Sequence, residues 1–87
     1  METIKQLISE GKTDEAIHLL DEYIEKNNTD DNAYYLRGNA YRKTGNIRLA
    51  LNNYLSAMEL NPDIPAVIAH NLLIAILNFY NKDMYNQ

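Results

Sequence analysis

Apolar residues recur at helical spacing in five separate stretches of this chain. The clearest is the second, in which the apolar positions follow the i, i+4, i+7, i+8 pattern of one helix face: Ala16, Ile17, Leu20, Tyr23 and Ile24. The spacing predicts helices over residues 2–10, 13–26, 32–43, 47–60 and 65–80. No run of four or more residues alternates apolar and polar positions with β-branched enrichment. The pattern therefore predicts an all-α chain of five helices.

Residues with special backbone preferences stand at the expected helix ends. Gly11 and Gly45 are predicted to end the first and third helices, since glycine adopts the left-handed conformation at low cost. Pro62 follows the fourth helix and Pro65 is expected to start the fifth. The predicted N-caps of the second, third and fourth helices are Thr13, Asp30 or Asp31, and Asn46.

The chain also contains an internal repeat. Gly11 and Gly45 are 34 residues apart, and so are Ala16 and Ala50. Such a period, with small and aromatic residues at fixed offsets, is typical of helix–turn–helix units that stack on one another. The second unit has the fuller set: Tyr34, Gly38, Tyr41, Gly45, Ala50, Tyr54, Ala57 and Pro62.

This second unit resembles a tetratricopeptide repeat (TPR), whose pattern is an aromatic residue, Leu-Gly, Tyr, Ala, an aromatic residue and Pro. The resemblance implies a single domain over 1–87, a right-handed stack of two helical hairpins closed by a long C-terminal capping helix. The parts are repeat one (1–30, partial), repeat two (31–64) and the terminal helix (65–82). We expect Gly38 and Ala50 to let the two helices of a hairpin approach closely, and Tyr34, Tyr41 and Tyr54 to fill the space around them.

The resemblance also implies a function, because TPR proteins bind segments of other proteins along a concave surface lined by the first helix of each repeat. The corresponding positions are Glu2, Lys5, Ile8 and Ser9, then Asn32, Tyr35, Leu36, Asn39, Arg42 and Lys43, then Ala66, Ala69, His70 and Leu73. One TPR subclass binds the C-terminal carboxylate of chaperones, but only Asn39 of its residue set stands in place. Ala66 and His70 occupy positions that need Lys and Arg, so we reject that reading.

Charge narrows the range of partners. The net charge is −4, and residues 1–31 contain nine acids and three bases, whereas residues 32–63 contain two acids and four bases. An acidic chain without a basic cluster is a poor candidate for nucleic acid or an anionic membrane surface. We expect a protein partner. Lys5, Asn39, Arg42 and Lys43 could form a mildly basic face that binds acidic peptides, or they could be an ordinary solvated surface.

Catalytic and metal-binding constellations are missing from the sequence. His18 and His70 are on different helices, there is no cysteine, and the three glycines are isolated. We therefore predict no enzyme, no cofactor and no metal site. The N-terminus has no basic stretch followed by an apolar one, so we expect a cytoplasmic protein.

Arg37 stands where the TPR pattern has leucine. It could anchor an acidic partner, or its stem could pack between repeats while its head reaches Asp21, Glu22 or Glu25. We favour the second interpretation, because arginines commonly pack their aliphatic stem on apolar surface while the charged head reaches solvent.

The fifth helix is apolar on nearly every side, and such a helix is usually buried on every side. We expect Val67, Ile68, Leu72 and Ala75 to pack on the second repeat, leaving Leu73, Ile76, Leu77 and Tyr80 without an obvious partner. The alternative function is therefore a homodimer formed through this helix, unless the tail covers it through Met84 and Tyr85. Together, the predicted protein-binding residues are Lys5, Tyr35, Asn39, Arg42, Lys43, His70, Leu73, Ile76 and Leu77.

Overall fold

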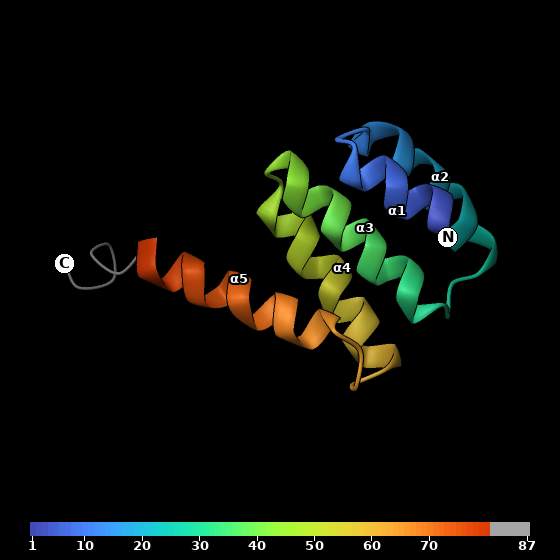
Figure 1. Ribbon diagram of the computed structural model, residues 1–87. Coiled ribbons are helices and arrows are strands. Elements are labelled where there is room, and N and C mark those ends of the chain that lie inside the picture. Colours follow the sequence, from blue (N-terminus) through green and yellow to red (C-terminus); the bar gives the residue numbers. More distant parts are fainter. Residues whose placement is uncertain (81–87) are drawn as a thin grey trace.

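The computed structural model describes residues 1–80 as five helices in chain order (Figure 1). The helices are α1 (Glu2–Ser9), α2 (Thr13–Lys26), α3 (Asp31–Thr44), α4 (Ile47–Leu60) and α5 (Ala66–Tyr80). Over these residues there is no strand, which confirms the predicted all-α fold. Each helix packs on the next one along the chain, and α1 also contacts α3. The predictions that the terminal helix reaches residue 82 and that Met84 and Tyr85 cover it lie outside the described residues.

Most of the predicted helix ends are confirmed. Gly45 ends α3 with a φ of 90°, and Gly11 has a φ of 84° in the turn after α1. The Asp30 side chain accepts hydrogen bonds from the backbone N–H groups of Asn32 and Ala33, and Asn46 accepts one from Leu49. These caps satisfy N–H groups that have no partner within the helix.

The predicted N-cap of the second helix and the predicted first residue of the fifth helix are each wrong by one residue. Thr13 is the first residue of α2, and the N-cap is Lys12, which makes no side-chain cap. The short turn after α1 explains this, because the Lys12 N–H bonds back to the Leu7 carbonyl and the Lys12 carbonyl already accepts the first bond of α2 from Ala16. Pro65 precedes α5 instead of starting it, since its carbonyl accepts from the Ala69 N–H.

The core consists of two clusters, one on each side of α3. The first joins α2 and α3 through Leu20, Ile24, Ala33 and Leu36. The second joins α4 to α5 and includes Ala50, Tyr54, Ala57, Ile64, Ala66 and Leu73. Ala50 and Tyr54 are completely buried, as the repeat pattern predicts.

Gly38 lies at the closest approach of α3 and α4. A Cβ atom built on Gly38 would stand 2.6 Å from two ring carbons of Tyr54 and 3.2 Å from the carbonyl oxygen of Ala50. Both distances are below ordinary van der Waals contact. The predicted seam of the second hairpin is therefore confirmed, with the Tyr54 ring directly on the glycine.

The face by which α5 packs differs from the prediction. Ala66 and Leu73 are buried, whereas Ile68 and Leu72 are 74% and 53% exposed. The prediction was wrong in placing Leu73 among the unpartnered residues and Ile68, Leu72 and Ala75 in the packed face. A helix packs closely through small and apolar side chains, and here the small residues Ala66 and Ala69 lie beside Leu73 on the same side.

Candidate protein-binding groove

A hollow of about 370 Å³ lies between α1 and α3. Its lining comes from the facing sides of these two helices: Lys5, Ile8, Ser9, Tyr35, Leu36 and Asn39. Lys5, Tyr35 and Asn39 belong to the predicted binding residues, so the structure brings three of them together. The hollow combines apolar side chains with a few polar groups, among them the Lys5 ammonium, the Ser9 hydroxyl and the Asn39 amide, which is a usual composition for a ligand-binding cleft.

Two further predicted residues stand at the C-terminal end of α3. Lys43 donates a hydrogen bond from Nζ to the backbone carbonyl of Ser9 over 3.2 Å, which ties the end of α3 to the end of α1. Arg42 is exposed on the same turn. The basic residues on this side of α3 therefore stand beside the hollow, and Lys43 also holds its two walls together.

Tyr54 of α4 orients the Asn39 side chain. The buried Tyr54 hydroxyl donates a hydrogen bond to Oδ1 of Asn39, and the Tyr54 ring packs on Tyr35 with ring centroids 6.1 Å apart. The acceptor oxygen of the Asn39 side chain is therefore bonded to a core residue. Its amide N–H₂ is the part left to donate toward a ligand in the hollow. From the sequence, Tyr54 is expected only to pack in the core, because nothing in the repeat pattern indicates which residue its hydroxyl contacts.

Burial raises the pKa of the Tyr54 phenol above its ordinary value near 10. The phenol is neutral in both folded and unfolded chains below that value. Above it, the unfolded chain ionises first and binds fewer protons than the folded one, so stability falls as pH rises. We expect the alkaline decrease in unfolding free energy to be shallower in Tyr54→Phe than in wild type when urea unfolding is measured across this range. Parallel curves would contradict this.

The predicted residues on α5 do not join the hollow. Leu73 is buried in the core cluster and cannot serve as an accessible anchor. His70 lies half-buried, with its Nδ1 3.4 Å from Oδ1 of Asn71. Ile76 is exposed and Leu77 half-buried. The expectation that Leu73 contributes to an accessible concave surface is therefore not met, and His70 does not line this hollow.

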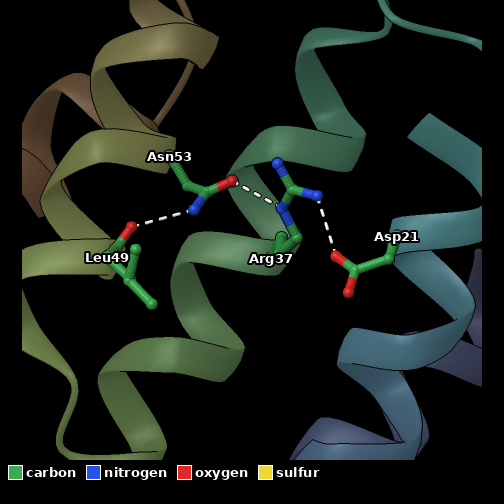
Figure 2. A network of polar contacts seen from close by, with 4 residues as sticks. All are labelled: Asp21, Arg37, Leu49 and Asn53. Carbon is green, nitrogen blue, oxygen red and sulfur yellow. Dashed lines mark hydrogen bonds and ion pairs between the residues drawn. The ribbon is translucent and has the colours of Figure 1, made fainter. Parts of the chain in front are cut away.

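Arg37 is a structural residue in a polar network that links three helices (Figure 2). Its Nε donates to Oδ1 of Asn53 on α4 over 2.7 Å, and its Nη1 forms an ion pair with Asp21 on α2 at 2.8 Å. Asn53 in turn donates to the Leu49 carbonyl over 2.8 Å. The interpretation that Arg37 reaches Asp21 between repeats is confirmed. Asn53 is the member that the sequence did not reveal.

Within residues 1–80, no group of three or more His, Cys, Asp or Glu side chains could hold a metal ion. In the same part of the chain, every helix is too short or too polar to span a bilayer.

The comparisons with known proteins agree with this architecture. Residues 32–64 match the family model of the tetratricopeptide repeat. This chain belongs to the TPR family. The match covers α3, α4 and the turn after α4, the hairpin that contains Gly38 and Tyr54.

This TPR chain is also similar to a solved structure, the solution NMR structure of Bacteroides fragilis protein BF1650. The two are 55% identical, the similarity covers 99% of this chain and 88% of the other, and the TM-score is 0.87. The curated proteins gave no match. TPR folds are generally interaction scaffolds without catalytic activity of their own, which agrees with the protein-interaction class inferred from the sequence.

Proposed function

We propose that this TPR chain is a scaffold that binds a segment of another protein in the hollow between α1 and α3. The observation that carries the proposal is the lining itself, in which Ile8, Leu36 and the Tyr35 ring lie beside the Lys5 ammonium and the oriented amide of Asn39. A cleft with a mainly apolar wall and few polar groups supports binding of a side chain together with a backbone carbonyl or carboxylate.

The charges beside the hollow favour an acidic segment as the ligand. Lys5 and Asn39 line the hollow, and Arg42 and Lys43 stand on the next turn of α3. The Lys5 ammonium also lies 3.4 Å from Oε1 of Glu2, in an exposed pair that an acidic ligand would have to compete with. Opposite charges at exposed positions contribute mainly to association rate and specificity, so we expect binding to weaken as salt is added. The net charge of −4 and the lack of a basic cluster make a nucleic acid or an anionic membrane surface a poor partner.

The test compares two lysine variants in affinity capture from the native host followed by quantitative mass spectrometry. Lys5→Glu reverses the charge inside the hollow, and Lys26→Glu makes the same change at an exposed residue outside it. We expect Lys5→Glu to reduce recovery of the specific partner by about tenfold or more, which corresponds to the loss of one charged hydrogen bond. Lys26→Glu should behave like wild type.

A partner recovered equally by both variants would contradict binding in the hollow. Helical circular dichroism of both variants checks that each one folds, because both lysines are exposed and neither belongs to the core. Peptides tiled across the recovered partner then locate the bound segment by fluorescence anisotropy, and an acidic segment with an apolar neighbour is expected.

A second function remains proposed alongside the first, namely self-association through α5. The apolar side chains that α5 leaves exposed support it, although burial moves the relevant surface from Leu73 and Leu77 to Ile68 and Leu72. Exposed apolar patches of this kind mark interaction sites.

A further inference from the structure

The outward side of α5 forms an apolar face that no other helix of residues 1–80 covers. Four residues at i, i+4, i+7 and i+8 compose it, and we name them the outer stripe: Ile68, Leu72, Ala75 and Ile76. Ile68, Leu72 and Ile76 are 74%, 53% and 41% exposed. This spacing is that of a helix face that packs on another helix. The far end of α5 also extends away from the other four helices (Figure 1).

The internal repeat indicates what belongs on this face. Thirty-four residues before the outer stripe, the same positions hold Tyr34, Gly38, Tyr41 and Arg42. In α3, Gly38 lies against Tyr54 of α4, and Tyr34 and Tyr41 pack on the cluster that contains Tyr54. Because α3 and α4 form a hairpin, the covering helix is antiparallel. The positions of Ile68, Leu72 and Ala75 are therefore ones that the repeat covers with an antiparallel helix, whereas Ile76 matches the exposed Arg42 and extends the stripe by one turn.

We propose that the outer stripe is the interface of a homodimer in which α5 packs antiparallel on α5 of a second copy. A two-fold axis at Leu72 makes the stripe complementary to itself. Leu72 then meets Leu72 of the second copy, and Ile68 meets Ile76, because each lies four residues from the axis. The second copy thus supplies the antiparallel helix without any change in α3 or α4.

The distribution of charge favours a second copy over a charged partner. No residue from Ala66 to Tyr80 is Asp, Glu, Lys or Arg, so the stripe has no counterion to offer a charged helix. Seven of the nine acids of residues 1–31 belong to α1, α2 and the turn between them, on the far side of α3 and α4 from α5 (Figure 1). A two-fold axis through α5 therefore keeps the two acidic ends apart, which limits their repulsion.

The size of the stripe sets the expected affinity. Four side chains from one helix give an interface at the low end of specific protein–protein contacts. We therefore expect Kd to be about 1–100 µM, so that dimers dissociate on dilution. Sedimentation velocity from about 1 µM to 1 mM spans that transition.

The decisive variants place the same negative charge on and off the stripe. Leu72→Glu puts two carboxylates at the axis and is expected to raise Kd by at least about 100-fold. Asn78→Glu adds one charge at an exposed position of α5 outside the stripe and should leave Kd unchanged within about threefold. A wild-type chain that stays monomeric throughout overturns the proposal, whether the face is left bare or belongs to another protein. The proposal is also overturned if Leu72→Glu and Asn78→Glu have the same Kd.

Cross-linking tests the antiparallel register independently. The chain has no cysteine, so a single introduced cysteine reports one contact only. Leu72→Cys should oxidise to a covalent dimer, because the two residues meet at the axis and a disulfide requires Cα atoms about 4.4–6.8 Å apart. Ile68→Cys should cross-link with Ile76→Cys in a mixture. Asn78→Cys should form no covalent dimer. Cross-linking of Ile68→Cys with itself in preference to the mixture would overturn the register.

This proposal is independent of the groove between α1 and α3. Leu72→Glu should retain partner capture by the hollow, and Lys5→Glu should retain the dimer. The failure of either proposal can therefore be recognised without the other.

Discussion

Replacing Gly38 by leucine is expected to unfold the chain. Even a single Cβ at this position would stand 2.6 Å from the Tyr54 ring and 3.2 Å from the Ala50 carbonyl oxygen. The ring has no room to retreat, because Tyr54 is completely buried. Overpacking usually costs about 1–3 kcal/mol, and leucine adds three more carbons to the same space. We expect loss of the helical circular dichroism signal and of a cooperative melt, and unchanged melting would contradict the close contact.

A milder pair of variants separates the clash from the helix propensity of glycine. Alanine is about 1 kcal/mol better than glycine inside a helix, so Gly38→Ala alone combines that gain with the steric cost. In a Tyr54→Leu background the ring is absent and only the contact with the Ala50 carbonyl oxygen at 3.2 Å remains, so Gly38→Ala should be less destabilising there than in the wild type. A double-mutant cycle by urea unfolding measures the coupling. Additive effects would mean that Tyr54 does not determine the need for glycine.

The second hairpin could be predicted from sequence because its special positions each have a strong physical reason. Gly38 and Ala50 lack bulk, Gly45 reverses the chain with a positive φ, and Tyr54 fills the core. These residue types have few other roles in a helical repeat. The period of 34 residues then placed α2 and α4 in the same register.

The packing of α5 could not be predicted in the same way. A helix face is recognised when polar residues mark the solvent side, and α5 is apolar on nearly every side. Contacts with the α4 cluster determine that Leu73, and not Ile68 or Leu72, faces the core. The local sequence does not encode these contacts. The misplacement of Leu73 within the candidate site follows from this one error.

The hollow between α1 and α3 was predictable in position but not in detail. Lys5, Tyr35 and Asn39 stand on the first helix of each repeat, which is where the TPR pattern places its binding surface. The orientation of Asn39 depends on the Tyr54 hydroxyl, fifteen residues away on another helix. Only a structure brings such a pair together.

Arg37→Ala is expected to destabilise the fold by about 1–3 kcal/mol, although the residue is polar and near the surface. The loss does not come mainly from the ion pair with Asp21, because that carboxylate is half exposed and such pairs contribute about 0–1 kcal/mol. It comes from Asn53, which is 7% exposed and accepts from Arg37 Nε over 2.7 Å. Without Arg37, Oδ1 of Asn53 has no donor and stays desolvated. The guanidinium also lies 5.5 Å from the centroid of the Tyr34 ring and loses that contact.

Urea unfolding of three variants distinguishes these contributions. Asp21→Ala should cost less than about 1 kcal/mol, since it removes only the exposed pair. Arg37→Leu restores the residue type of the TPR pattern yet should still destabilise, because Asn53 remains without its donor. The double variant Arg37→Leu with Asn53→Leu replaces both partners by apolar groups, and such exchanges are nearly neutral or stabilising. If Arg37→Ala and Asp21→Ala cost the same, the ion pair and not the buried amide is what Arg37 supports.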